Sequence, residues 1–213
     1  MIRTLAGIIC AFSVAASSAA IAQTPPDETI KKATAELQQT IQKRQVEFRK
    51  DSKLFYAEVD RIVSPSFDLK YITQLILARH YRTATEDQRR RFQTAFKKML
   101  IASYATAMLD YADSVKTDWQ PLRMAADAMD VTVQSKVLRQ DGPPLPLGFA
   151  MRLKDGEWKV YDILVENISL ISNFRSQTAS EIKHSSLDAL IQKLEGGKTL
   201  EAPKSGTKSN TGS

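Results

Sequence analysis

The stretch LGFAMRLKDGEWKVYDIL, residues 147–164, decides the fold. Large apolar side chains alternate on both sides of a central turn, at Leu147, Phe149, Met151, Leu153, Trp158, Val160 and Leu164, with Asp162 as the one polar residue in the series. Period-two alternation is typical of a strand with one buried face. The turn holds Asp155-Gly156, a pair that suits a tight two-residue hairpin. We therefore predict two antiparallel strands here.

A third strand is expected upstream, where Val131, Val133 and Val137 alternate. The turn signal Asp141-Gly142-Pro143-Pro144 separates it from the first strand of the hairpin. Strands joined by such short turns pair as antiparallel neighbours, so the three form a meander.

The chain before residue 115 has the period of helices instead. Apolar residues at spacings of three and four predict helices over about 26–48, 54–63, 69–76 and 86–111. Asp68 is expected to cap the third, and Thr85 through Gln88 fit the capping-box pattern of the fourth. Two more helices are expected near 170–174 and 187–194. The predicted fold class is α+β, a helical N-terminal half packed on a small antiparallel meander and followed by C-terminal helices.

The first 22 residues read as a cleavable secretory signal peptide. Arg3 precedes an apolar run, and Ala20-Ile21-Ala22 forms a small-x-small cleavage site. Cleavage would remove Cys10, the one cysteine, so we expect no disulfide, thiolate nucleophile or cysteine metal site in the mature chain.

The remaining chain reads as one domain with a tail. Residues 23–195 have the composition of an ordinary globular domain. Residues 196–213 are rich in Gly, Lys, Ser and Thr and offer little apolar surface to bury, so we expect a disordered tail.

No catalytic or metal-binding motif is found in the sequence. The two histidines, His80 and His184, stand apart, and no carboxylate cluster has ligand spacing. We therefore expect no enzyme activity, no metal and no cofactor. The formal charge of +6 favours anionic partners only weakly, and an exported chain without a basic-aromatic motif fits nucleic-acid binding poorly.

Positive charge is concentrated between residues 79 and 98. The bases are Arg79, Arg82, Arg89, Arg90, Arg91, Lys97 and Lys98. Such a run is commonly a solvated helix face, and the functional alternative is contact with anionic headgroups or an acidic partner surface. We take these residues as the candidate partner contacts.

The C-terminal half carries a family resemblance. The blocks 156–163 (GEWKVYDI), 166–170 (ENISL) and 173–177 (NFRSQ) resemble the MlaC family of periplasmic phospholipid-binding proteins, also called toluene-tolerance proteins. Weaker matches are PSFD at 65–68 and the stretch from Tyr81 to Phe92. Together the matches run from about residue 24 to 195.

The resemblance implies a soluble shuttle in the periplasm of a Gram-negative bacterium. Family members carry a phospholipid between an outer-membrane lipoprotein–porin complex and the inner-membrane Mla transporter, and so maintain outer-membrane lipid asymmetry. A monomer is the simplest state for such a carrier.

A lipid carrier needs an internal cavity. Each buried CH₂ contributes ~0.8 kcal/mol, so two chains of about 16 carbons represent roughly 25 kcal/mol of exposure to avoid. We expect the long helix and one sheet face to line this cavity. In the last strand, Trp158 and Val160 are expected on one face and Tyr161 and Ile163 on the other. We choose the face of Tyr161 as the cavity wall, because the opposite face carries Asp162, which suits a lipid-lined wall poorly. The candidate lining residues are Phe92, Phe96, Met99, Leu100, Tyr104, Met108, Val133, Phe149, Met151, Tyr161, Ile163, Val165, Ile168, Leu170 and Phe174.

Two alternatives remain open. The chain could carry another amphiphile, such as a hopanoid. It could also be a periplasmic adaptor with a filled core that binds no lipid.

Overall fold

The computed structural model describes residues 23–112, 115–139 and 142–201. The expected signal peptide and most of the expected tail lie outside these residues. The described chain begins with helices: α1 (Pro26–Lys50), α2 (Ser52–Val63), the 3-10 turn η1 (Ser64–Ser66), α3 (Leu69–Leu77), α4 (Arg79–Thr83) and α5 (Glu86–Tyr111).

The helix starts follow the capping residues of the sequence. The Asp68 carboxylate accepts the Tyr71 N–H at 3.2 Å, and the Thr85 hydroxyl accepts the Gln88 N–H at 3.1 Å. The Gln88 side chain accepts the Thr85 N–H in return, which completes the predicted capping box.

The sheet is an antiparallel meander with the order β1-β2-β3-β4-β5. Its strands are β1 (Lys116–Trp119), β2 (Asp130–Leu138), β3 (Leu145–Lys154), β4 (Glu157–Val165) and β5 (Ile168–Ser169). The three predicted strands are confirmed as β2, β3 and β4. The two edge strands were not predicted, because four and two residues are too few to show a period. At the tight turn Asp155 and Gly156 both have positive φ, 51° and 83°.

A β-bulge at Tyr161 corrects the predicted face of β4. Met151 pairs with Val160, but Ala150 pairs with Asp162, so Tyr161 is the extra residue. The bulge reverses the alternation, and Val160 and Ile163 therefore pack in the same apolar cluster. The prediction that Ile163 lies on the opposite face from Trp158 and Val160 is wrong for this reason, whereas Tyr161 packs in a separate cluster with the helices.

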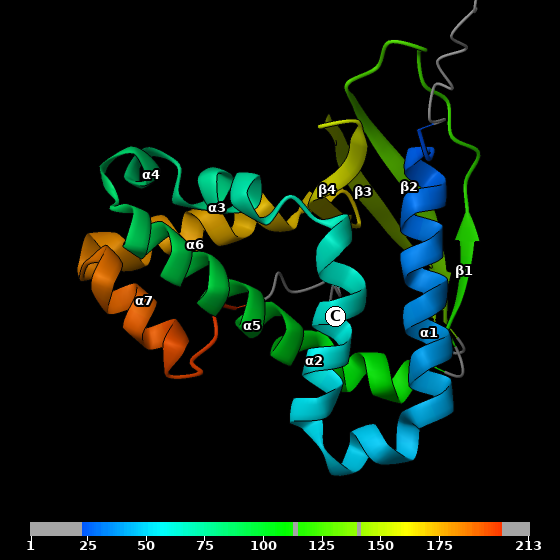
Figure 1. The fold of residues 1–213 in the computed structure, drawn as a ribbon, viewed down its shortest axis with the longest axis horizontal. Helices are drawn as coiled ribbons and strands as arrows, with labels where there is room; N and C mark the ends of the chain where they lie inside the picture. The colour runs from blue at the N-terminus through cyan, green and yellow to red at the C-terminus, as the bar shows by residue number, and fades with distance from the viewer. Residues whose placement is uncertain (1–22, 113–114, 140–141, 202–213) are drawn as a thin grey trace, which may run out of the picture.

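The C-terminal helices α6 (Leu170–His184) and α7 (Leu187–Glu195) pack with α3 and α5 to the left of α2 in Figure 1, and both α3 and α6 also contact β4. The ordered chain continues past the predicted boundary at 195. Leu200 is buried in the core of these helices, and Glu201 exchanges two hydrogen bonds with the Gln177 side chain. The prediction of a disordered tail is therefore wrong for its first residues, because Leu200, the one leucine after residue 195, is buried in an apolar cluster.

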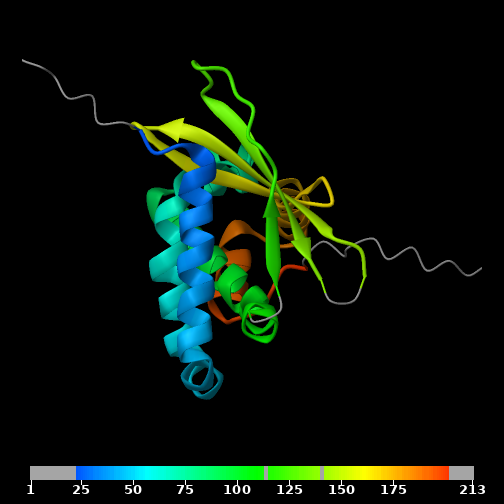
Figure 2. The ribbon, with the colours of Figure 1, turned by 90° about the vertical axis from the view of Figure 1, so that its right-hand side faces the viewer.

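The described residues form three apolar clusters that hold the helices and the sheet together. The first joins α3, α5, α6 and α7 around Phe92, Phe96 and Phe174. The second joins α1, α2 and α5 around Phe48 and Phe55. In the third, Ile30 of α1 packs on the inner face of the sheet; Figure 2 shows α1 standing along the sheet.

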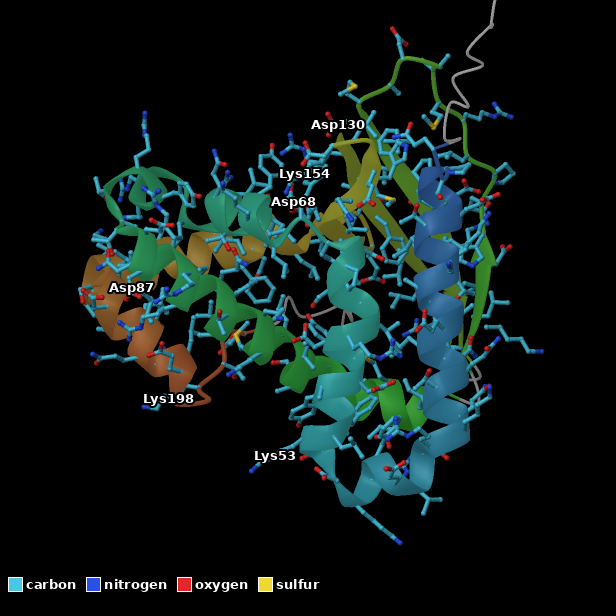
Figure 3. All side chains as sticks on the ribbon, in the orientation of Figure 1. Lys53, Asp68, Asp87, Asp130, Lys154 and Lys198 are labelled. Carbon is cyan, nitrogen blue, oxygen red and sulfur yellow. The ribbon has the colours of Figure 1, made fainter. Side chains whose placement is uncertain are left out.

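Asp68 ties the helices to the sheet. Its N–H donates to the Val160 carbonyl at 2.9 Å, and its carboxylate, in a residue that is 4% exposed, lies 3.0 Å from the Lys154 ammonium. Figure 3 labels Asp68 at the start of α3 and Lys154 beside it. One buried side chain thus caps a helix and pairs with a strand.

We expect Asp68→Ala to lower the free energy of unfolding by about 2 kcal/mol, the sum of a lost cap and a lost, half-exposed ion pair. Urea denaturation measures this. Asp68→Asn keeps an acceptor for the cap and should lose about half as much. Asp118→Ala, an exposed carboxylate of β1, is the control and should change stability by less than about 0.5 kcal/mol. An Asp68→Ala variant as stable as this control would contradict the role given to Asp68.

Candidate functional site

An apolar pocket lies where α3, α5 and α6 meet the bulge of β4. Its volume is about 70 Å³. It is lined by Phe67, Leu69, Ile72, Thr73, Gln93, Phe96, Lys97, Leu100, Tyr161, Asp162, Ile163, Leu170, Ile171 and Phe174. Carbon atoms form nearly all of its exposed lining, so the pocket suits an apolar group.

Aromatic rings from α5 and α6 form the floor of the pocket. Phe96 meets Phe174 edge to face at 5.1 Å between ring centroids, and Phe92 stacks on Phe96 at 5.6 Å. Phe96 and Phe174 are both almost fully buried. Because Phe96 belongs to α5 and Phe174 to α6, the floor depends on how these two helices pack.

Asp162 lines the pocket, although the sequence argument kept it out of the wall. Its carboxylate accepts the Ile171 N–H at 3.1 Å and the Ser169 hydroxyl at 2.5 Å. A carboxylate at a helix N-terminus is stabilised by the free N–H groups there. The expectation that Asp162 is excluded from the wall is therefore wrong, because α6 begins beside it.

Lys97 lies at the pocket but is held by another residue. Its ammonium contacts both Asp60 oxygens at 2.7 Å. Burial raises the pKa of the Asp60 carboxyl, but the hydrogen bonds from Lys97 and Ser64 outweigh it and leave that pKa below its usual value. Lys97 of α5 thus forms an ion pair with Asp60 of α2 and joins the two helices.

Tyr161 lines the pocket and contacts α3. Its ring meets that of Tyr71 edge to face at 5.5 Å, and the Arg152 guanidinium lies 4.1 Å above the Tyr71 ring. Burial raises the pKa of the Tyr161 hydroxyl, so it stays neutral. The bulge residue is therefore fixed between a helix and the sheet.

Six of the predicted lining residues meet at this pocket. They are Phe96, Leu100, Tyr161, Ile163, Leu170 and Phe174. Three elements, α5, β4 and α6, bring them together, although the residues lie up to 78 positions apart in the sequence.

The other predicted lining residues lie elsewhere. Phe92 and Met99 pack in the helical cluster behind the pocket. Met108 packs against α1 and α2, and Val133, Phe149 and Met151 pack on the inner sheet face. Tyr104 and Val165 are half-buried outside the pocket, and Ile168 is 46% exposed. The long helix does not face the sheet along its length, because α1 covers much of the inner face.

Sequence reasoning missed several lining residues. Leu69 and Ile72 stand on the predicted buried face of the third helix, so the period of that helix could have indicated them. Ile171 is likewise an apolar residue of the helix predicted near 170–174, whereas Phe67 and Gln93 carry no comparable signal.

The basic segment divides into two groups. Arg89 stacks on Tyr81 at 4.4 Å and donates to the Tyr81 carbonyl, and Arg91 pairs with Glu195 at 2.7 Å. With Lys97 these bases bind their own chain. Arg79, Arg82, Arg90 and Lys98 are exposed.

Within the described ranges, no three His, Cys, Asp or Glu side chains gather as metal ligands do, and no helix has the length and apolar character to span a bilayer.

The chain is similar to known proteins over most of its length. Residues 31–196 match the family model of the MlaC protein. The toluene tolerance protein ttg2D of Pseudomonas putida is 31% identical over 168 residues, which are 78% of this chain and 77% of that protein. The intermembrane phospholipid transport system binding protein MlaC of Haemophilus influenzae is 25% identical over 191 residues, 88% of each chain.

A solved structure has a similar fold. It is the phospholipid-binding protein from Ralstonia solanacearum in complex with a phospholipid, with a TM-score of 0.74 and 30% identity. The match covers 81% of this chain and 96% of that one.

Filling the pocket should exclude apolar molecules from it. We expect N-phenyl-1-naphthylamine to fluoresce on binding the delipidated protein, and Leu170→Trp, which places an indole in the pocket, to lower its affinity about tenfold. Ile182→Trp is the matched control, since Ile182 is also half-buried on α6 but does not line the pocket. Equal affinity in the two variants would show that the probe binds elsewhere.

Proposed function

Because this chain belongs to the MlaC family, we propose that it is a periplasmic carrier that binds a phospholipid by its acyl chains and shuttles it between outer- and inner-membrane complexes. The observation that carries the proposal is the apolar pocket between the helices and the bulge of β4. The relatives from Haemophilus and Ralstonia are named for phospholipid transport and phospholipid binding, which supports a phospholipid as the ligand.

The size of the pocket sets a physical condition on this function. A volume of about 70 Å³ is far below the ~300–1,000 Å³ of typical ligand sites, so two acyl chains require the walls to separate. The walls belong to different layers, the helices α3, α5 and α6 on one side and β4 on the other. We propose that lipid entry moves these layers apart.

The widened site would expose residues that now lie behind the walls. Phe92 and Met99 lie behind Phe96, and Phe149 packs with Ile163 on the inner sheet face. We propose the rest of the predicted set as further lining of the occupied state: Tyr104, Met108, Val133, Met151, Val165 and Ile168. Flexible methionines adapt to chains of varied length.

The partners in this proposal are membrane complexes that give and receive the lipid. The exposed bases Arg79, Arg82, Arg90 and Lys98 offer positive charge to such surfaces. Arg89, Arg91 and Lys97 contact residues of their own chain. We propose that they support docking indirectly, because these contacts hold α5 in place. No residue is assigned a catalytic role, and lipid moves through binding and release alone.

Mass spectrometry of organic extracts from the purified protein tests the proposal. We expect a diacyl phospholipid in the wild type and about a tenfold loss of it in Leu100→Asp, because a carboxylate in the pocket wall disfavours hydrocarbon. Ile101→Asp is the control: this neighbour on α5 is half-buried but lies outside the pocket, and its variant should retain the lipid.

Each alternative has its own outcome in this experiment. A polycyclic lipid in the extract would identify a hopanoid-type carrier, and an extract without lipid would identify an adaptor. Loss of lipid in both variants, with both still folded by circular dichroism, would contradict the placement of the acyl chains.

A further inference from the structure

A second groove lies on the opposite side of α5 from the pocket, between α2, α5 and α7. Its volume is about 760 Å³, and it is open to solvent. Tyr56, Ala57, Ala95, Met99, Ala102 and Leu194 form its apolar floor. The three alanines leave room for another backbone to approach the helices closely.

The acidic side chains of this groove are already neutralised. Asp60 pairs with Lys97, and Glu195 pairs with Arg91, each at 2.7 Å. The hydrogen bonds from Arg91 hold the pKa of the Glu195 carboxyl below its usual value, so this pair is fully charged at neutral pH. Two carboxylates along the groove are thus unavailable to a partner.

The rim that remains is positive. Lys53 of α2 and Lys98 of α5 line the groove, are exposed and have no ion-pair partner among the described residues. Arg90 also lines the groove, and its guanidinium forms an ion pair with Asp87 of the same helix. Lys198 follows directly after the lining residue Gly197, and Figure 3 shows Lys53 and Lys198 near this side of the molecule.

We propose that this groove docks an acidic amphipathic helix of a partner protein. The helix would lay its apolar stripe on the alanine-rich floor and place carboxylates against Lys53 and Lys98. A lipid chain fits the groove less well, because the open side would leave the hydrocarbon in water. The proposal takes the carrier function as its premise and assigns a docking surface to it.

A designed peptide tests the proposal. The probe is a fluorescein-labelled amphipathic peptide of about 18 residues, or five helical turns, with leucines on one face and glutamates on its flanks. We expect it to bind the full chain in fluorescence anisotropy, and its affinity to fall about tenfold in Lys53→Glu/Lys98→Glu and on addition of salt.

Lys136→Glu/Lys183→Glu is the matched control. It makes the same change in net charge at two exposed lysines outside the groove and should leave the affinity within about twofold. A peptide of the same composition with its leucines scattered around the helix should bind at least about tenfold more weakly.

Three results would overturn the proposal: no binding of the peptide, equal loss of affinity in the two double variants, or equal binding of the scattered peptide. Phosphatidylglycerol vesicles that bind through Lys53 and Lys98 while the peptide does not would also overturn it, in favour of a membrane contact. Lipid retention is measured on the same variants by mass spectrometry. Retained phospholipid with failed peptide binding would reject this docking surface and leave the carrier function standing.

Discussion

The β-bulge at Tyr161 is the constraint on which the site depends. Without the extra residue, strict alternation would turn Ile163 away from the face that Trp158 and Val160 share. With it, both halves of β4 contribute to the inner face, and Tyr161, Asp162 and Ile163 lie in sequence along one pocket. The start of α6 next to Asp162 closes the other side of the pocket.

The same arrangement bears on the proposed entry of a lipid between the helices and the sheet. The aromatic floor lies within the helical cluster, whereas the opposite wall belongs to the sheet. Two contacts join the helices to the sheet at one end. They are the ion pair between Asp68 and Lys154 and the ring contact between Tyr71 and Tyr161. The proposed entry of hydrocarbon requires the apolar walls to separate while the Asp162 carboxylate keeps its hydrogen bonds to Ser169 and Ile171 at the start of α6.

The sequence predicts the regular part of the fold well, because period, caps and turn residues are local signals. Thr85 with Gln88 and Asp155-Gly156 each specify their geometry within four residues. The bulge could not be predicted, since no residue of β4 marks it. The burial of Leu200 beside Met99 depends on a contact across 101 positions, which no local pattern contains. For the candidate site, periodicity and the need for a lipid cavity indicated apolar candidates, and tertiary packing decides that Phe96, Ile163 and Phe174 meet while Met108 and Val133 do not.

Photo-crosslinking tests the central claim most directly. A phosphatidylglycerol with a diazirine in mid-chain is loaded into the protein and irradiated, and the modified peptides are identified by mass spectrometry. The account predicts labels on the segments that carry Phe96, Leu100, Ile163 and Phe174. Labels confined to the groove between α2, α5 and α7, or no stable loading at all, would contradict it.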